Sequence, residues 1–497
     1  MRLARLLPWL AATGALVLVL AVTHRHGLGV SLDSVAYARA AESLVERGRL
    51  EIPLTSWESE ASYEPLSHFP PALPLIFAAV VRLLDVDPYT AGRWLNAACI
   101  FGTALMALLP VADSAVAVLT VAALLVGPSF VTMHVWLWSE PVFLLLVVLS
   151  ARLAVRARTE SATLRDVMLI AACAGLATLT RYAGLSLFAG LGLLLLFSAV
   201  SLKAKVRRIV WYCGFYTATV LPWFWWLSAI GAAPRSLGLY TENAWHGIVR
   251  PALRTVVGWF LPASLPLLPA LAGVATVFVV LALVCIQRAR AREDFHIGPV
   301  AYVAAVLLVV HVGFLVVARL IADPSMPFDE RILSAALVLT ALGLGEVAKS
   351  LYPVGLPVIP SVLLGVVALG NVMGTAPQLV HTVRHGEGYL SDPWTGSETI
   401  AWLRSAPPGL TIFSNAPDLI CAWLPVTAKY TPAHYEMARL AELAARVDGS
   451  APAVVVLFDD PHAGWLLPRA QLMDALTPDE TRVLSDGVIL SWGTTEG

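Results

Sequence analysis

Two acidic residues stand at the edges of apolar or helix-like stretches, and each could hold or move a proton. Asp33 opens a helix-like stretch, 33–47, that Gly48 ends in the C′ position. There a carboxylate can serve as an N-cap or as a general base held just outside a bilayer. Glu140 opens an apolar run, where the helix dipole alone would favour a negative charge, although an acid at membrane depth is also a candidate functional residue. The residues alone leave both interpretations of each acid open.

Two arginines border apolar segments in a similar way. Arg181, followed by Tyr182, interrupts the apolar segment 166–199, and Arg331 follows Asp329-Glu330 at the start of another apolar run. A single arginine at such a place often anchors a helix by snorkelling. A guanidinium group is also well suited to hold a phosphate bidentately. Arginines and acids that converge on one membrane face therefore indicate a site for a lipid-linked phosphate.

Aromatic and histidine side chains near these residues have structural explanations as well. Tyr37 lies one turn after Asp33 and would share its helix face. His68 precedes Phe69-Pro70-Pro71, where the prolines are suited to start a helix. We expect the tryptophans late in the run 209–230 to form an interfacial belt rather than a sugar platform: Trp223, Trp225 and Trp226.

Composition indicates the solvent in which these residues work. Of 497 residues, 58% are hydrophobic and only 13% are charged, so a bilayer is expected to surround much of the chain. The formal net charge of -1 argues against a nucleic-acid partner, which would need a basic surface. The five cysteines show no metal-binding spacing, and no P-loop, dinucleotide fingerprint or nucleophile elbow occurs.

Hydropathy predicts about eleven spanning helices in an all-α polytopic membrane domain. The expected spans are 7–23, 92–110, 112–127, 136–155, 166–181, 183–199, 209–230, 262–286, 297–320, 331–349 and 355–374. The segment 70–84 is expected to lie along the surface, because four basic clusters then all fall on the cytoplasmic side. These clusters are Arg2/Arg5, Arg152/Arg156/Arg158/Arg165, Lys203/Lys205/Arg207/Arg208 and Arg288/Arg290/Arg292.

This topology divides the chain into two domains. Residues 1–374 form the membrane domain, with juxtamembrane helices and a long first outer loop, 24–91. Residues 375–497 form a small extracytoplasmic α/β domain, so the N-terminus is cytoplasmic and the tail is outside. Its expected elements alternate between helix-like and strand-like segments: 397–405, 411–414, 417–424, 453–458, 468–476 and 488–492.

Several short motifs, taken in order, resemble the GT-C superfamily of membrane glycosyltransferases, which includes protein O-mannosyltransferases and aminoarabinose transferases. The resemblance covers residues 30–200 best, 323–345 weakly and the tail hardly at all. Its motifs are Asp33-Ser34-Val35-Ala36-Tyr37, His68-Phe69-Pro70-Pro71-Ala72-Leu73-Pro74, Ser139-Glu140-Pro141, Leu179-Thr180-Arg181-Tyr182 and Phe328-Asp329-Glu330-Arg331.

The resemblance implies transfer of a sugar, with inversion, from a polyprenyl-phosphate donor to a glycan, lipid or protein acceptor on the outer face. Asp33 would be the general base, Arg181 and Arg331 would hold the donor phosphate, and Glu140 would orient the acceptor or assist a metal. Further substrate contacts are expected from Tyr37, His68, Tyr182 and Glu330.

A divalent cation is a possible cofactor, but no metal ligand is assigned. Many relatives carry a second acid directly after the first, whereas this chain has Ser34 there, and a hard cation needs several oxygen ligands.

Two other classes of protein fit the same composition. A transporter or lipid flippase would also be apolar and polytopic, although its charges would more often lie at the midplane of broken helices in repeated halves. A silent membrane scaffold with an outer binding domain is the third alternative. The preference for Arg over Lys, with abundant Ala and Val, favours a bacterial plasma (inner) membrane protein of the cell envelope.

Overall fold

The computed structural model describes residues 2–232, 237–241, 245–262, 265–290, 298–351, 358–450, 452–459 and 465–493. Arg292 of the fourth basic cluster and residues 355–357 of the last predicted span lie outside these ranges. Contacts group the chain into two compact units. The first contains Met1–Val22, Phe69–Leu73 and Arg93–His381, and the second contains Thr23–His68, Pro74–Gly92 and Thr382–Gly497.

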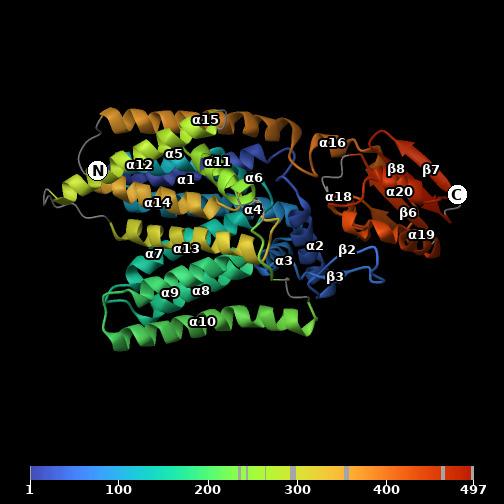
Figure 1. Ribbon diagram of the computed structural model, residues 1–497, viewed down its shortest axis with the longest axis horizontal. Helices are drawn as coiled ribbons and strands as arrows, with labels where there is room; N and C mark the ends of the chain where they lie inside the picture. The colour runs from blue at the N-terminus through green and yellow to red at the C-terminus, as the bar shows by residue number, and fades with distance from the viewer. Residues whose placement is uncertain are drawn as a thin grey trace. The chain divides into compact units, whose positions relative to one another are not determined.

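The first unit is helical (Figure 1). Its longer helices are α1 (Arg2–Val22), α4 (Pro88–Leu108), α5 (Ala115–Leu125), α6 (Pro128–Val135), α7 (Glu140–Ala157), α8 (Leu164–Thr180), α9 (Leu185–Leu196), α10 (Leu202–Ala229), α11 (Arg250–Gly258), α12 (Leu267–Arg290), α13 (Pro299–Ile321), α14 (Ser334–Leu351) and α15 (Val358–His385). Short turns are η1 (Leu109–Val111), η2 (Tyr182–Gly184) and η3 (Trp245–Val249).

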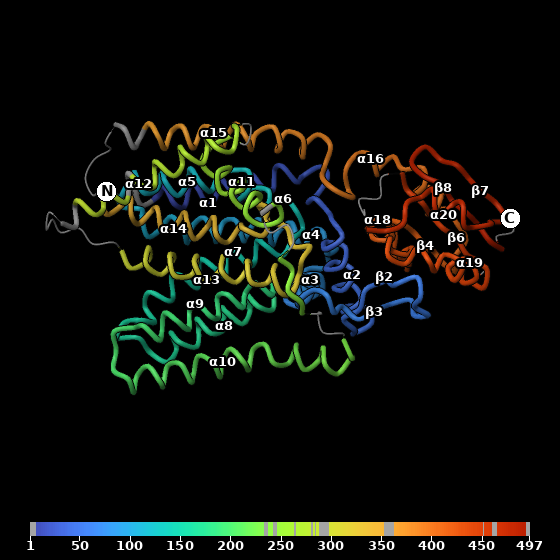
Figure 2. Tube along the Cα trace, in the orientation of Figure 1, coloured from blue at the N-terminus to red at the C-terminus, as the bar shows by residue number. Residues whose placement is uncertain are grey.

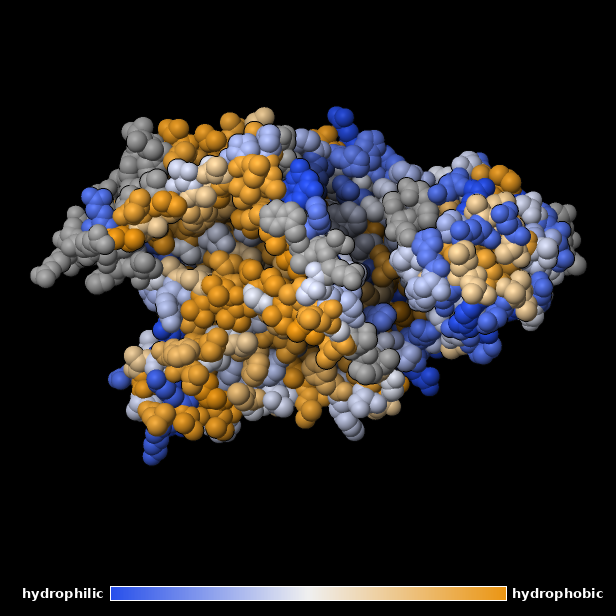
Figure 3. All heavy atoms as spheres, viewed as in Figure 1, coloured by the Kyte–Doolittle hydropathy of each residue, from blue (hydrophilic) through white to orange (hydrophobic). Residues whose placement is uncertain are grey.

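One large apolar core holds this bundle together. Helix α8 packs against α7 and α10, and α13 packs against α9 and α14, with the helix axes running close to parallel in Figure 1. Small residues such as Ala174 and Ala177 are fully buried where α8 meets its neighbours, which allows the backbones to approach closely. Hydrophobic side chains also cover much of the visible outer face of these helices (Figure 3), as expected for helices solvated by lipid.

Each predicted spanning range carries a helix, but length and hydropathy support fewer complete spans. Among the described residues, four helices are long and apolar enough to cross a membrane, or five if α5 and α6, bent by 58°, form one broken span. The other ranges hold helices that are shorter or more highly charged. Helix α7, for example, contains Glu140, Arg152 and Arg156. The predicted surface segment 70–84 forms α3 (Ala72–Leu84), a shorter apolar helix.

The second unit is built on a six-stranded mixed sheet in the order β2-β5-β4-β6-β8-β7. Strands β2, β5, β4 and β6 run parallel, and β8 joins β6 and β7 in antiparallel pairs. The sheet strands are β2 (Leu54–Thr55), β4 (Thr411–Ser414), β5 (Ala428–Tyr430), β6 (Ala453–Phe458), β7 (Glu480–Leu484) and β8 (Gly487–Trp492). The central β6, Ala-Val-Val-Val-Leu-Phe, is buried on both faces, which explains its continuous apolar sequence.

Helices and a small hairpin complete this unit. The helices are α2 (Leu32–Arg47), α16 (Asp392–Thr395), α17 (Glu398–Ser405), α18 (Pro417–Trp423), η4 (His434–Arg439), α19 (Leu440–Gly449) and α20 (Arg469–Ala475). The hairpin strands are β1 (Glu51–Ile52) and β3 (Glu64–Pro65). The structure contains each helix and strand that was predicted for the tail, and their ends lie within a residue or two of the expected ones.

Most of the first loop belongs to this second unit. Strand β2 of the loop pairs in parallel with β5 of the tail, so both belong to one sheet, and in Figure 2 the blue segment at β2 lies beside the red tail. Val30 bonds through its backbone to the tail, receiving a hydrogen bond of 2.8 Å from the Tyr389 amide. The side chain of Arg39 donates to the carbonyl oxygens of Cys421 and Leu424. These contacts tie helix α2 and the residue Val30 that precedes it to the tail.

The structure confirms the predicted end of helix α2 and corrects its predicted N-cap residue. Gly48 adopts φ 69°, the left-handed C′ conformation predicted for it. The N-cap residue is Ser31, however, and not Asp33. The Ser31 backbone amide donates a hydrogen bond to Ser34 Oγ at 3.0 Å. The interpretation of Asp33 as the N-cap residue was therefore wrong.

Candidate functional site

Glu140 lies at the first turn of α7, where the sequence placed it. Ser139 is the N-cap residue, and Pro141 fits the first turn because its missing N–H would have no helical partner there. The preceding segment is pinned by Asn96, which donates to the carbonyl oxygens of His134 and Trp136 at 3.1 and 2.7 Å. The segment that leads into α7 is thus fixed by hydrogen bonds to α4.

Arg181 is presented by a sharp break between α8 and α9. Its backbone leaves the helix at φ -148° and ψ 136°, and the chain returns through η2. Gly184 makes this return possible, because a Cβ there would lie 2.3 Å from the Thr178 backbone nitrogen. The Gly184 amide donates to the Arg181 carbonyl at 2.8 Å, which closes the turn. The guanidinium group therefore projects from a rigid corner.

Arg331 comes from the turn that precedes α14. Asp329 organises this turn, since its Oδ1 accepts hydrogen bonds of 3.0 Å from the amides of both Arg331 and Ile332. The carbonyl of Phe328 accepts a further bond from Thr255 on α11. The Arg331 guanidinium lies over the Trp138 ring, with its central carbon 4.6 Å from the ring centroid, a cation–π geometry.

These three elements bring their charges together at Glu140. Its Oε1 accepts hydrogen bonds from Arg181 Nη1 and from Arg331 Nε. The Glu140 side chain has no exposed surface, whereas those of Arg181 and Arg331 are 17% and 24% exposed. Ser139 Oγ receives a further bond of 3.3 Å from Arg181. The predicted convergence of two arginines and an acid is therefore present within one unit.

The cluster carries excess positive charge. Two guanidinium groups and one carboxylate leave a net charge of +1, as 2 − 1 = 1. The second carboxylate oxygen, Oε2, is buried and has no hydrogen-bond partner within the described part of the chain. A group of two guanidinium groups and one carboxylate suits an anionic ligand.

A buried histidine close to this cluster was not predicted. His311 on α13 is 2% exposed, and its Nδ1 lies 2.7 Å from Ser186 Oγ. Ser186 gives its own proton to the Ala183 carbonyl at 2.7 Å. The imidazole Nδ1 must therefore donate to Ser186, which leaves Nε2 as a buried acceptor with no partner among the described residues. A lone histidine in an apolar run gave no signal of this pair.

The predicted aromatic residues divide into two environments. Trp223 is buried and donates through Nε1 to the Tyr182 hydroxyl at 3.3 Å, so it supports the residue that follows Arg181. Trp226 stacks on Trp223 with ring centroids 4.9 Å apart. Trp225 is 74% exposed, as an interfacial side chain would be. Glu330, next to Arg331, is exposed.

Asp33, Tyr37 and His68 belong to the second unit. Asp33 is half-buried, Tyr37 is 2% exposed and His68 is exposed. Tyr389 donates a hydrogen bond to the buried carboxylate of Asp418. Burial, followed by the charge of Asp418 and the hydrogen bond to it, raises the pKa of Tyr389, with a smaller contribution from the charge of Asp33. Asp33 therefore lies within electrostatic range of a fixed tyrosine–aspartate pair.

A metal site is not evident from the side chains. Among the residues that the structure describes, no group of three or more His, Cys, Asp and Glu side chains could hold a metal ion. The possible divalent cation remains an open prediction.

The fold of this chain is similar to the folds of several solved enzymes, among them an arabinofuranosyltransferase and an oligosaccharyltransferase. The chain is an integral membrane protein. The sequence matches no protein-family model, and no curated protein matches it either.

The likeness is to particular solved enzymes. ArnT from Cupriavidus metallidurans bound to undecaprenyl phosphate aligns over 97% of both chains, with a TM-score of 0.60 and 14% identity. Arabinofuranosyltransferase AftD from Mycobacteria aligns over 99% of this chain and 42% of its own, with a TM-score of 0.53 and 13% identity. The Archaeoglobus fulgidus oligosaccharyltransferase in complex with Zn and sulfate aligns over 94% and 70%, with a TM-score of 0.51 and 13% identity.

Proposed function

We propose that this protein is a glycosyltransferase that moves a sugar from a polyprenyl-phosphate donor to an acceptor hydroxyl on the outer face of the membrane. The observation that carries the proposal is the buried Arg181–Glu140–Arg331 cluster within a GT-C fold. ArnT, the neighbour that aligns over its full length, was solved with undecaprenyl phosphate bound. A phosphate on a lipid carrier is therefore the ligand class with the strongest support.

The charge of the cluster suits the leaving group. A sugar–phosphate–lipid diester carries one negative charge, and the released monoester carries about −1.5 to −2 at pH 7. Because negative charge grows on the phosphate as the glycosidic bond breaks, arginines fixed in advance stabilise the transition state more than the bound donor. Glu140 holds the two guanidinium groups in place and keeps their mutual repulsion in check. We therefore assign Glu140 an orienting role toward Arg181 and Arg331.

Asp33 supplies the proton acceptor in this mechanism. Its carboxylate removes the proton from the acceptor hydroxyl, and that oxygen forms a bond to the anomeric carbon as the bond from carbon to the phosphate oxygen breaks. The electron pair of the broken bond leaves with the phosphate, so a single in-line displacement inverts the anomeric configuration. Support comes from the motif around Asp33 and from its place in the first turn of helix α2, two residues after the N-cap Ser31. No nucleotide sugar takes part.

A transfer assay with a matched pair of carboxylate variants tests this function. Purified protein is incubated with undecaprenyl-phosphate-linked sugars and envelope extract, and release of undecaprenyl phosphate is followed. Asp33→Asn is expected to lower turnover by at least a hundredfold, since general-base catalysis contributes about 10²–10⁴. Glu46→Gln, at an exposed position of the same helix, should retain full turnover.

Donor binding gives the second arm of the test. Arg331→Met should weaken binding of undecaprenyl phosphate by roughly tenfold or more, because a charge-assisted hydrogen bond contributes about 1.5–3 kcal/mol. Asp33→Asn should bind the lipid as well as the wild-type protein does. Movement of intact donor across vesicle membranes without release of its sugar would instead favour the flippase alternative.

A further inference from the structure

An aromatic pair lies beside the arginine cluster in the first unit. Trp136 is the C-cap residue of α6, and its ring stacks on that of Trp138, with the centroids 4.8 Å apart and the planes 17° apart. The guanidinium carbon of Arg331 lies 4.6 Å from the centroid of the Trp138 ring. Trp138 therefore contacts both a second ring and a cation, and the mechanism proposed above gives it no role.

The interior of the bundle holds the two rings in place. The Trp136 carbonyl accepts hydrogen bonds from the Trp138 amide at 2.9 Å and from Asn96 on α4 at 2.7 Å. Leu137, between the tryptophans, has no exposed surface, and both tryptophans are half-buried. The position of the Trp138 ring is thus set by α4 and by the bundle core, so the ring can act as a fixed support.

Arg331 is restrained at its edge and at its face. Its Nε donates to Glu140 Oε1, and its backbone amide donates to Asp329 Oδ1 at 3.0 Å. A single hydrogen bond at Nε does not by itself fix the tilt of the guanidinium plane. The Trp138 ring restrains this tilt, because an aromatic face attracts the cation. A bidentate contact to phosphate oxygens requires a planar fork whose tilt is fixed.

We propose that Trp138 is a positioning residue for Arg331, and that it raises the affinity of the cluster for the phosphate of a polyprenyl-phosphate lipid. The inference deepens the function proposed above and rests on its assignment of Arg331 to the donor phosphate. Trp138 itself touches no reacting atom. It holds the guanidinium group in place before the lipid binds, so less conformational freedom is lost on binding.

Core packing is the other explanation for a half-buried tryptophan here, since Trp138 packs against the core of the bundle. The two roles depend on different properties of the ring. A cation is attracted by the negative charge on the ring face, which fluorine substituents withdraw with little change in ring shape. Packing depends on the shape of the ring, so fluorination separates the two roles.

Site-specific replacement of Trp138 by mono-, di- and trifluorotryptophan tests the proposal. Thermophoresis measures binding of undecaprenyl phosphate and of neutral undecaprenol to the full-length protein in detergent. The affinity for undecaprenyl phosphate should fall stepwise with fluorine number, by at least threefold for trifluorotryptophan, because a cation–π contact changes an equilibrium by about two- to thirtyfold. The affinity for undecaprenol should stay constant.

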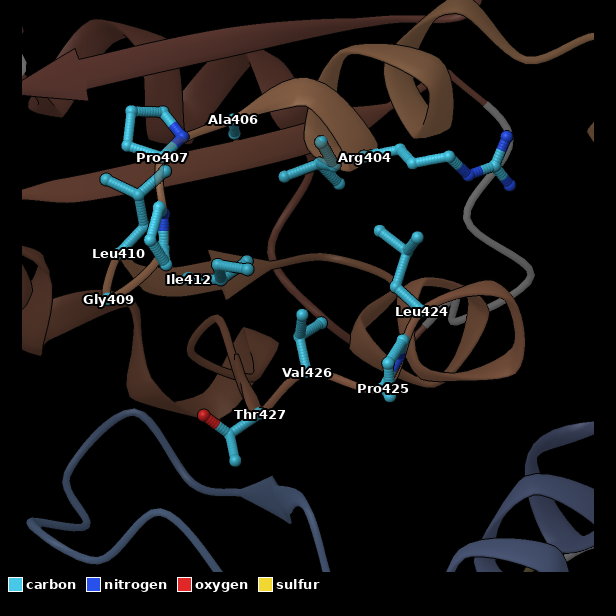
Figure 4. Close-up of a pocket in the computed structure, with 12 residues that line it drawn as sticks. Arg404, Ala406, Pro407, Gly409, Leu410, Ile412, Leu424, Pro425, Val426 and Thr427 are labelled. Atoms are coloured by element: carbon cyan, nitrogen blue, oxygen red, sulfur yellow. The ribbon is translucent and has the colours of Figure 1, made fainter.

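Two controls use other parts of the chain. In the second unit Arg439 lies over the Trp57 ring at 4.8 Å, so the same fluorinated series at Trp57 weakens a similar contact and should leave lipid binding unchanged. Arg404 lines a cavity of about 480 Å³ in the second unit, together with apolar side chains such as Leu424 (Figure 4). Arg404→Met should also leave lipid binding unchanged, which excludes uptake of the lipid phosphate at that cavity.

Conventional variants show whether Trp138 acts through Arg331. Trp138→Leu should weaken binding of undecaprenyl phosphate at least fivefold, whereas Trp138→Phe, which keeps an aromatic face, should lose less. In the Arg331→Met background, Trp138→Leu should cause no further loss, because the cation that the ring supports is already absent.

Four results would each overturn the proposal: constant affinity across the fluorinated series, equal loss of undecaprenyl phosphate and undecaprenol binding, additive effects of the Trp138 and Arg331 substitutions, or a loss of binding in Arg404→Met. Sugar transfer by the wild type with constant affinity across the series would reject the role of Trp138 alone. A stepwise series without any transfer would reject the glycosyltransferase proposal alone. Wild-type protein that binds no undecaprenyl phosphate would overturn both.

Discussion

Replacing Glu140 with Gln removes the one negative charge between Arg181 and Arg331 while keeping the shape of the side chain. Both guanidinium groups bond to the same buried oxygen, so the variant removes the carboxylate charge that these two largely buried cations share. Removing one partner of a buried ion pair typically costs about 3–5 kcal/mol of folding free energy. The amide oxygen can still accept hydrogen bonds, which places the expected loss near the lower limit, about 3 kcal/mol.

Unfolding titrations in mixed detergent micelles measure this loss. Glu160→Gln is the matched control, because it neutralises an exposed carboxylate in a loop of the same unit and should change stability by less than about 0.5 kcal/mol. Arg331→Met should cost less than Glu140→Gln, since Glu140 then keeps Arg181 as a partner. A Glu140→Gln variant as stable as the control would refute the interpretation of the cluster as a mutually compensated group.

Three further outcomes follow from local contacts. Arg39→Met, which loses bonds to the Cys421 and Leu424 carbonyls, should speed hydrogen exchange in helix α2 at least tenfold by mass spectrometry, while exchange in α8 stays unchanged. Gly184→Ala should cost more than about 2 kcal/mol or abolish folded protein in detergent, because its Cβ meets backbone; Gly214→Ala, which meets open space, is the control. Burial raises the pKa of the Cys421 thiol to about 12, so it should resist maleimide at pH 8 until the protein is unfolded; rapid labelling of the native protein would contradict this.

The central cluster could be predicted from sequence because charges within apolar segments must find partners. Glu140, Arg181 and Arg331 each border such a segment, and the positive-inside rule assigned them one side. Their meeting in one unit follows from that reasoning. Asp33 was singled out as an acid at the start of a helix-like stretch, and one of its two interpretations, the N-cap, was wrong because Ser31, two residues earlier, is the N-cap residue.

Other features depend on contacts that sequence patterns do not encode. The His311–Ser186 pair joins residues 125 positions apart within two apolar helices, and neither residue has a distinctive neighbour. Strand β2 has two residues, too few for any alternation pattern, yet it extends the sheet of the tail. Tail strands such as β6 were predictable because continuous Val, Leu and Phe residues require burial on both faces.

The pairing of β2 with β5 has a consequence for biosynthesis. The side chain of Arg39 donates hydrogen bonds to backbone carbonyls 382 and 385 positions later in the chain. Ribosomes synthesise the chain from the N-terminus, so residues 23–68 of the second unit must remain incompletely folded until the tail has been made. Such high contact order predicts slow maturation and a dependence on chaperones at the translocon. Premature termination near residue 380 would then leave a membrane-inserted product in which helix α2 lacks its contacts with the tail.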